Sequence, residues 1–225
     1  MMPPFRVLPA GDAALVVEVP ERIDAELNAW CVSLGRSLTS SFGAAVRDVV
    51  VGFVSVTVYF DPLTVDARWV EDEIYARAER LDVDAAAVGA TIEVPVCYGG
   101  ESGPDLAHVA AFAGCAEAEV VERHTRRDYR VYMVGFVPGF AYLAEVDPLI
   151  AAPRRSSPRI AVPEGSVAIA GGQTGIYPSV SPGGWNIIGR TTVKPYDAAR
   201  TEPFLFRTGD CVRFRSVPSD ELFRS

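Results

Sequence analysis

The amino-acid sequence predicts an α+β protein in which a small N-terminal α/β open-sheet domain is followed by a β-barrel domain. Residues 1–90 combine strand-like runs with two amphipathic helical segments. From Tyr129 onward, short β-prone runs are interrupted by glycine and proline, without a helical periodicity longer than two turns. The acidic, alanine-rich stretch Leu81–Gly89 is typical of a linker or a frayed helix end. We therefore place the domain boundary near residue 90 and expect domains 1–90 and 91–225.

The first domain is expected to be an open sheet with helices on one face. Two helical segments each place apolar side chains on one side, and such faces pack into a core. The first face comprises Leu27, Trp30, Cys31, Leu34 and Leu38, and the second comprises Val70, Ile74, Ala78 and Leu81. Thr64 is the predicted N-cap of the second helix. The strand-like runs are Phe5–Pro9, Ala14–Val19, Val46–Val51 and Val54–Phe60.

The second domain is expected to open with the strand Thr91–Val96. Gly103-Pro104-Asp105 is typical of a helix start, with Pro104 at the first helical position and an acid that complements the helix dipole. Its buried face should comprise Leu106, Val109, Ala110 and Ala113, and Gly114 should be its C-cap. A second short helix is expected over Ala116–Thr125. The remaining chain should form a compact β-barrel or a folded-over sheet.

The charge pattern argues against nucleic acid and points to an anion site in the second half. The chain carries 21 basic and 29 acidic side chains, which disfavours a partner bound through phosphate contacts. Residues 123–200 nevertheless hold nine Arg and Lys194 against five acids. Lys194 is the only lysine in the sequence, and no G-x-x-x-x-G-K-[ST] phosphate loop is present.

The cysteines and hydropathy indicate a cytoplasmic protein without a metal site. Cys31, Cys97, Cys115 and Cys211 are scattered and form no C-x-x-C pair, so we expect buried thiols rather than a zinc site. No apolar run approaches the roughly 18 residues of a membrane span, and the first residues lack the apolar region of a signal peptide. We therefore expect no membrane association.

Four segments are unusually rich in glycine, proline and aromatic residues. They are GFVPGFAYL at 135–143, PRRSSPR at 153–159, VPEGSVAIAGGQTGIYP at 162–178 and SPGGWNIIGRT at 181–191. Together they resemble the signature of the 5-oxoprolinase B-subunit family, also called allophanate hydrolase subunit 1 or KipI-like (kinase A inhibitor-like). LPAGDAAL at 8–15, VCYGGE at 96–101 and GPDL at 103–106 also resemble family elements, so the resemblance covers nearly the whole chain.

The resemblance implies a cyclophilin-like barrel and a role as one component of an ATP-dependent 5-oxoprolinase. An allophanate hydrolase subunit 2-type partner, the C-type component of 5-oxoprolinase, would help this chain activate 5-oxo-L-proline with ATP and Mg at a shared site. A third protein, the A-type component, would open the lactam to give glutamate. Two alternatives stay open, namely a KipI-like inhibitor of a histidine kinase and a carboxyltransferase subunit related to urea carboxylase.

Three arginines in the motifs are candidate anion ligands. Arg154, Arg159 and Arg190 carry planar guanidinium groups that can hold carboxylate or phosphate oxygens in pairs. Glycines such as Gly183 and Gly184 stiffen or shape the loops that present them. The alternative is that these arginines pair with Glu164, Asp147 or a carbonyl group.

The same motifs contain candidates for catalysis and for a pocket wall. Gln173 and Thr174 follow two glycines and can form an oxyanion-type site, although a tight turn explains the pattern equally well. Near Arg123, Arg126 and Arg127, His124 should stay neutral and can act as a base, unless it is a surface or helix-capping residue. The aromatic residues Phe140, Tyr142, Tyr177 and Trp185 can line a pocket, an intersubunit patch or the core.

Overall fold

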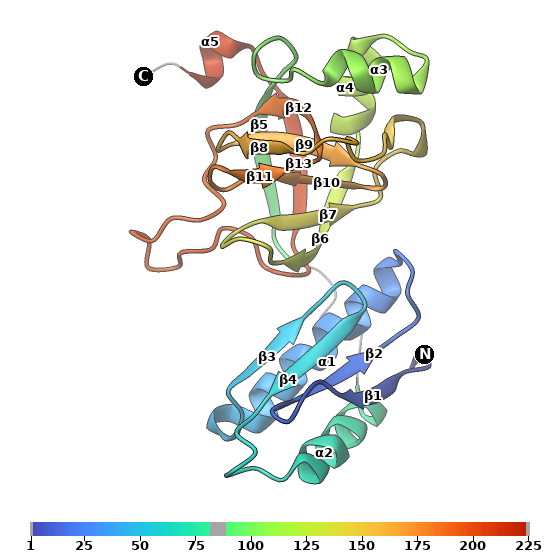
Figure 1. Ribbon diagram of the computed structural model, residues 1–225, viewed down its shortest axis with the longest axis vertical. Helices are drawn as coiled ribbons and strands as arrows, with labels where there is room; N and C mark the ends of the chain where they lie inside the picture. Colours follow the sequence, from blue (N-terminus) through green and yellow to red (C-terminus); the bar gives the residue numbers. More distant parts are fainter. Residues whose placement is uncertain (1, 82–88, 224–225) are drawn as a thin grey trace. The chain divides into compact units, whose positions relative to one another are not determined.

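The computed structural model describes residues 2–81 and 89–223, and the chain divides into two compact units, Met1–Gly89 and Ala90–Ser225 (Figure 1). Most of the linker predicted over Leu81–Gly89 lies outside the described residues. No helix in the described ranges is long and apolar enough to cross a membrane.

The first unit is a four-stranded antiparallel sheet packed against two helices. Its sheet order is β1-β2-β4-β3. The elements are β1 (Arg6–Pro9), β2 (Ala14–Glu18), α1 (Ala25–Phe42), the 3₁₀ turn η1 (Gly43–Ala45), β3 (Asp48–Val51), β4 (Ser55–Tyr59) and α2 (Ala67–Glu79). Alternate residues of β2 and β4, such as Val17 and Val58, share one core cluster with both helical faces. The predicted open sheet with amphipathic helices is therefore confirmed.

The predicted N-cap of α2 is wrong by two residues. Asp66 occupies the cap and accepts a hydrogen bond from the Arg68 backbone N–H at 2.9 Å. Thr64 instead closes the preceding turn, because its backbone N–H and its hydroxyl both bond to the Asp61 carbonyl oxygen at 3.0 and 3.3 Å. A residue engaged in one turn cannot also cap the next helix.

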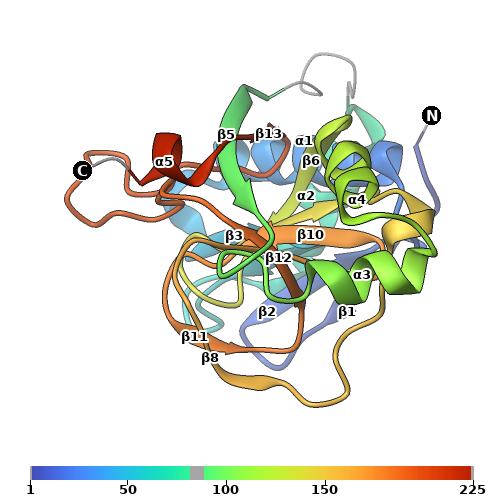
Figure 2. The ribbon, with the colours of Figure 1, turned by 90° about the horizontal axis from the view of Figure 1, so that it is seen from above.

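The second unit is built around a closed barrel of seven strands in the order β10-β7-β6-β13-β5-β12-β9, seen from two directions in Figures 1 and 2. The first half comprises β5 (Thr91–Tyr98), α3 (Leu106–Ala113), α4 (Glu117–Thr125), β6 (Asp128–Val134), β7 (Ala141–Ala144) and η3 (Pro148–Ile150). The second half comprises β8 (Arg159–Val162), β9 (Ser166–Ala170), β10 (Gln173–Ile176), β11 (Ser181–Gly183), β12 (Asn186–Arg190), β13 (Cys211–Ser216) and α5 (Ser219–Leu222). The α+β class and the barrel expected after Tyr129 are confirmed.

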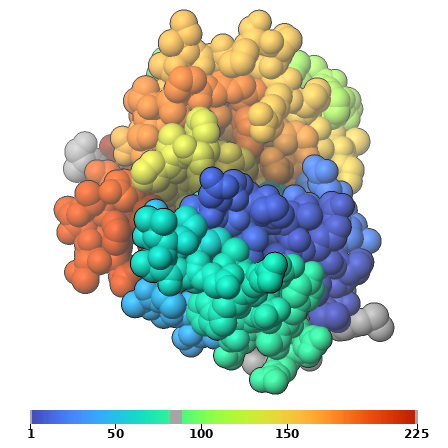
Figure 3. All heavy atoms as spheres, turned by 60° about the horizontal axis from the view of Figure 1, so that its bottom comes forward, coloured from blue at the N-terminus to red at the C-terminus, as the bar shows by residue number. Residues whose placement is uncertain are grey.

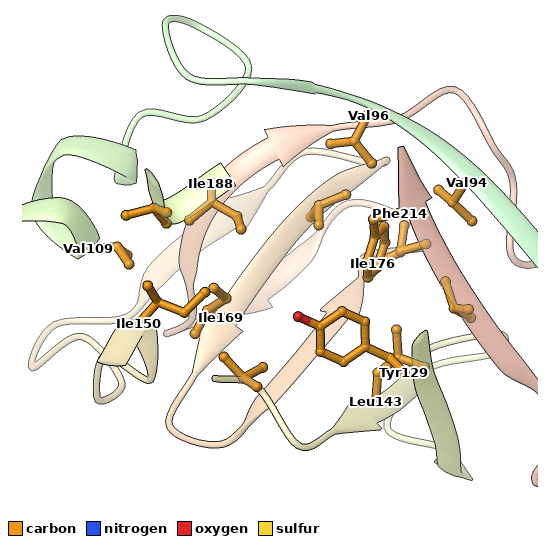
Figure 4. Packing of buried hydrophobic residues seen from close by; sticks show 14 of the residues in the cluster. Val94, Val96, Val109, Tyr129, Leu143, Ile150, Ile169, Ile176, Ile188 and Phe214 are labelled. Carbon is orange, nitrogen blue, oxygen red and sulfur yellow. The ribbon is translucent and has the colours of Figure 1, made fainter. Parts of the chain in front are cut away.

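Strand β9 separates two hydrophobic clusters, which explains why all five of its residues are buried. Ile169 points into the barrel core together with Tyr129 and Phe214 (Figure 4), and Val167 belongs to the same cluster. Ala168 and Ala170 belong to a second cluster, which also contains the aromatic residues Phe140, Tyr177 and Trp185. Because side chains alternate along a strand, β9 carries a core on one face and the floor of an aromatic cluster on the other.

Helix α3 differs from its prediction at the N-terminus. The helix begins at Leu106 with Asp105 in the cap position, so Pro104 precedes the cap and is not the first helical residue. The Asp105 side chain makes no capping hydrogen bond. The predicted C-cap Gly114 is confirmed, with a left-handed φ of 65°.

The cysteines are all free thiols, but only two are buried. Cys31 and Cys97 lie in the interior, whereas Cys115 and Cys211 are half-buried, so the expectation of four buried thiols is only partly correct. Burial raises the pKa of the Cys31 thiol to about 12, which keeps it protonated and unreactive.

Candidate functional site

A pocket of about 290 Å³ brings together all four motif segments of the second unit. Its lining comprises Phe136, Phe140, Tyr142, Arg154, Pro158, Tyr177, Pro182, Gly183, Gly184 and Trp185. In the space-filling view, the yellow-green surface near residue 135 adjoins the orange surface near residue 180 (Figure 3). Segments that are up to 50 positions apart in sequence thus meet at one site, and seven of the predicted site residues are among its lining.

The pocket wall is an aromatic cluster centred on Phe140. Its ring makes edge-to-face contacts with Tyr142, Tyr177 and Trp185 at centroid distances of 4.8, 5.3 and 5.4 Å. Such pairs contribute about 0.5–1.5 kcal/mol each beyond area burial. Gly183 permits this packing, because a Cβ at this position would lie 2.3 Å from the Tyr177 hydroxyl oxygen. These aromatic residues therefore line the pocket and also pack against one another, so the predicted pocket role and the predicted core role both apply.

Arg154 supplies the positive charge of the pocket. Its guanidinium carbon lies 5.9 Å from the Trp185 ring centroid, a cation–π distance. The neighbouring Arg155 and Arg159 are both paired with Asp105. Within the described part of the chain, Arg154 has no such carboxylate partner, and it is the only cation in the pocket lining. Its donors are available to an incoming anion.

The two pocket tyrosines remain protonated at neutral pH. Burial raises the pKa of Tyr142 above its usual value, although the positive charge of Arg154 acts in the opposite direction. Burial likewise raises the pKa of Tyr177, against the effects of a backbone hydrogen bond from Trp185 and of Arg154. Both phenols can therefore donate a hydrogen bond to an oxygen of a bound molecule.

The other two predicted arginine ligands are not brought to this pocket. Arg159 forms a two-bond ion pair with Asp105, at 2.8 and 2.9 Å. Arg190 is exposed, and its Nε donates to the Glu164 carbonyl oxygen at 3.2 Å. The alternative in which an arginine binds a carbonyl group describes Arg190, and Arg159 pairs with a carboxylate that the sequence did not suggest.

Gln173 and Thr174 lie in strand β10 and do not line the pocket. Thr174 is fully buried, and its hydroxyl donates to the Ala168 carbonyl oxygen at 2.9 Å. Gly171, just before this strand, adopts a left-handed φ of 57°. The geometry favours the tight-turn interpretation of the Gly-Gly pair over an oxyanion site.

His124 is fully buried in the barrel unit, with both ring nitrogens hydrogen-bonded. Its Nδ1 lies 2.8 Å from the Tyr98 hydroxyl, and its Nε2 lies 2.9 Å from the Thr174 hydroxyl. Because Thr174 already donates its single proton to Ala168, it must accept from Nε2–H, and Nδ1 must accept from Tyr98. The neutral imidazole with its proton on Nε2 therefore satisfies all three of these hydrogen bonds.

The neutral state predicted for His124 agrees with the structure, but the predicted cause is wrong. Burial, not the neighbouring arginines, lowers the pKa of His124 to about 3. Arg123 and Arg126 are instead paired with Asp147 at 3.0 and 3.3 Å. With both nitrogens occupied, the geometry favours a structural role for His124 over the predicted role as a base.

Sequence reasoning did not single out three other lining residues, Phe136, Pro158 and Pro182. Each of the three lies inside one of the four motif segments, and this location was the sequence signal that could have identified them as lining residues. Phe136 is 62% exposed and adopts a φ of 71°, which is rare for a residue other than glycine. Such strain persists only where the surroundings enforce it, and here it places an aromatic ring at the pocket rim.

The lining does not suit a magnesium-bound triphosphate. It contains no carboxylate, and one guanidinium is its only cation. Mg²⁺ prefers carboxylate and water oxygens, and a triphosphate needs several positive donors. Among the described residues, no group of three or more His, Cys, Asp or Glu is placed to hold a metal ion. The pocket suits a small, flat molecule with one carboxylate and an apolar ring.

Comparisons with known proteins place the chain in a family. Residues 5–206 match the family described as carboxyltransferase domain, subdomain C and D. The B subunit of 5-oxoprolinase from Bacillus subtilis (strain 168) is 37% identical over 93% of this chain and 92% of its own length. The protein of the same name from Escherichia coli O157:H7 is 40% identical, over 94% of each chain.

A solved structure agrees with this result. The crystal structure of TTHA0988 is 35% identical to this chain, with a TM-score of 0.80 over 91% of it, and the chain spans 40% of that longer protein. The matches in sequence and in fold both extend over nearly the full length. The chain belongs to the 5-oxoprolinase B-subunit family.

Proposed function

We propose that this chain, as the B subunit of an ATP-dependent 5-oxoprolinase, binds 5-oxo-L-proline in the aromatic pocket and presents it to a partner protein in the cytoplasm. Family membership supports the activity, since the curated relatives carry that name. The observation that carries the assignment to this pocket is Arg154, a cation without a carboxylate partner among the described residues, placed over Trp185 in an otherwise aromatic wall.

The chemistry of 5-oxoproline matches the pocket group by group. Its carboxylate can accept paired hydrogen bonds from Arg154, supplemented by the protonated hydroxyls of Tyr142 or Tyr177. Its apolar ring carbons can pack against Phe140 and Trp185. Held in this way, the substrate presents the lactam N–C=O edge to the mouth of the pocket, where a second protein can reach it.

The partner protein is proposed to supply what this pocket lacks. A five-membered lactam is a poor electrophile, and phosphorylation of its oxygen by ATP makes the ring carbon susceptible to attack by water. Because the lining contains no carboxylate for Mg²⁺, we assign the ATP and Mg site to the C-type component, an allophanate hydrolase subunit 2-type protein, or to its interface with this chain. The A-type component then opens the lactam: water adds to the phosphorylated carbon, the ring C–N bond breaks, and a second water releases phosphate, which gives glutamate.

The first test is ATP- and 5-oxoproline-dependent glutamate formation by the purified chain, alone and with the A-type and C-type components. We expect glutamate only in the complete mixture. An assembled mixture that forms no glutamate would contradict the proposal and favour the kinase-inhibitor or carboxyltransferase alternatives.

A second test addresses the pocket directly by comparing two ligands on the isolated chain. 5-Oxoproline and 2-pyrrolidinone share the lactam ring and differ only in the carboxylate. We expect calorimetric titration to show tighter binding of 5-oxoproline, with the difference abolished in Arg154→Ala. Equal affinities of both ligands for the unsubstituted chain would exclude Arg154 as the carboxylate ligand.

A further inference from the structure

Asp105 is 4% exposed and lies outside the pocket lining, yet its carboxylate accepts four hydrogen bonds. Arg155 donates one at 2.8 Å, and Arg159 donates two at 2.8 and 2.9 Å. The fourth comes from the Ile187 backbone N–H, at 2.8 Å. A helix N-cap residue usually bonds to its own helix, so this side chain serves another purpose.

The donors belong to the two segments that form one side of the pocket. Arg155 and Arg159 lie on the same loop as Arg154 and Pro158, and Ile187 lies two residues after the segment Gly183–Trp185. The carboxylate thus joins the arginine-bearing loop to the start of β12.

Two further hydrogen bonds join the same two segments on either side of Arg154. The Asn186 side-chain amide donates to the Pro153 carbonyl oxygen at 2.8 Å. The Arg155 backbone N–H donates to the Gly184 carbonyl oxygen at 2.8 Å. Both neighbours of Arg154 are therefore held against residues next to Trp185, which keeps the Arg154 backbone within reach of the Trp185 ring.

Asp105 itself is held in place by close packing on β12. Its backbone N–H donates to the Ile187 carbonyl oxygen at 2.9 Å, which completes a reciprocal pair with the bond from Ile187 N–H. Gly103, two residues earlier, lies so close to β12 that an added Cβ would be 2.0 Å from the Ile188 carbonyl oxygen. The GPDL segment at 103–106 thus holds Asp105 against β12.

From these contacts we propose that Asp105 is a positioning residue for the pocket: it holds the 153–159 loop so that Arg154 lies over Trp185, ready for the substrate carboxylate. The part that concerns substrate rests on the proposed function. The pKa of Asp105 supports an ionised side chain, because the Arg159 and Ile187 hydrogen bonds lower it despite the opposing effect of burial.

The chain offers a matched control in Asp147. This carboxylate is 7% exposed, caps η3, accepts a backbone hydrogen bond from Leu149, and pairs with Arg123 and Arg126. It is thus another buried carboxylate between two arginines. However, its arginines belong to α4 and its C-cap, not to the 153–159 loop that carries Arg154. Asp105→Asn and Asp147→Asn therefore remove equivalent charges, and only the first should disturb Arg154.

The test uses the full chain labelled with 5-fluorotryptophan and followed by ¹⁹F NMR. Three tryptophans give three resonances, and Trp185→Phe assigns the relevant one. We expect D105N to shift the Trp185 resonance toward its position in Arg154→Ala, while D147N leaves it unchanged. No shift in D105N, or equal shifts in both variants, would overturn the proposal. If D105N does not fold, Arg155→Gln should give a smaller shift in the same direction, and its absence would also overturn the proposal.

Kinetics of the reconstituted complex provide the second readout. We expect D105N to raise KM for the lactam substrate by about tenfold with a smaller change in kcat. The reason is that Arg154, which binds the substrate carboxylate, is displaced in this variant but is still present. D147N should leave KM at the unsubstituted value, and a rise in KM equal to that of D105N would count against the proposal. If the unsubstituted complex forms no glutamate, the proposed function fails, while the ¹⁹F comparison still decides the positioning role.

Discussion

Replacement of His124 should remove a specific pH dependence from the stability of the barrel unit. The imidazole is neutral in the folded protein, where its pKa is about 3, against an ordinary value of 6.5. Between these values the unfolded chain binds a proton that the folded chain does not. Stability is therefore lost as the pH falls below 6.5. From pH 7 to pH 5 this group alone should cost about 2 kcal/mol.

The variant His124→Gln keeps the hydrogen bonds but cannot titrate. An amide oxygen can accept from Tyr98, and the amide NH₂ can donate to Thr174, as the imidazole does. We expect H124Q to be less stable at pH 7 but to lose less stability than the unsubstituted protein on acidification. His108 is the only other histidine and is exposed, so His108→Gln is the matched control.

Urea unfolding at pH 7, 6 and 5 measures the effect, followed through amide signals of barrel strands, because two compact units need not unfold together. The difference in slope between H124Q and H108Q should correspond to about one proton. If H124Q keeps the full pH slope, the buried neutral imidazole is not its source, and the directional chain of hydrogen bonds is refuted.

Three further substitutions test the site and its support. Arg154→Ala should raise KM for the lactam substrate about 10- to 100-fold, because charge-assisted hydrogen bonds contribute about 1.5–3 kcal/mol. Arg190→Ala is the control and should leave KM unchanged. Equal effects of the two variants on KM would disprove the pocket assignment. Thr174→Val should cost about 1–3 kcal/mol of unfolding free energy, because a buried N–H loses its acceptor; a neutral result in urea unfolding would argue against that bond. Gly183→Ala should lower the Tm and weaken 5-oxoproline binding as Tyr177 is displaced, and an unchanged Tm would show that the site relaxes freely.

Local sequence patterns predicted much of the fold, because its helices and strands are specified largely by residues that are close together in the sequence. The faces that include Leu34 and Ile74 are buried as the helical period requires. Gly114 ends α3 because glycine readily adopts a left-handed conformation. The errors at Thr64 and Pro104 lie at helix ends, where several neighbouring residues compete for the same cap.

The site was predicted less completely because it depends on contacts between distant segments. Glycine and aromatic motifs indicated the pocket wall correctly, since such residues cluster where chains approach closely. The arginines could not be sorted by sequence, because their roles depend on where carboxylates lie. Asp105 is about 50 positions from the guanidinium groups that it binds, and no local pattern reveals that pairing. Likewise, the burial of His124 comes from strands on both sides of it in sequence.

The parallel pairing of β5 with β13 has a consequence for how this protein is made. Thr91 lies beside Cys211 and Val96 beside Ser216, so the first strand of the barrel is completed by the last. During translation the barrel cannot close until residue 216 has left the ribosome, and β5 offers an unpaired edge until then. Contacts over such sequence separations also slow folding. Truncation even a few residues into β13 should therefore yield an open, aggregation-prone chain.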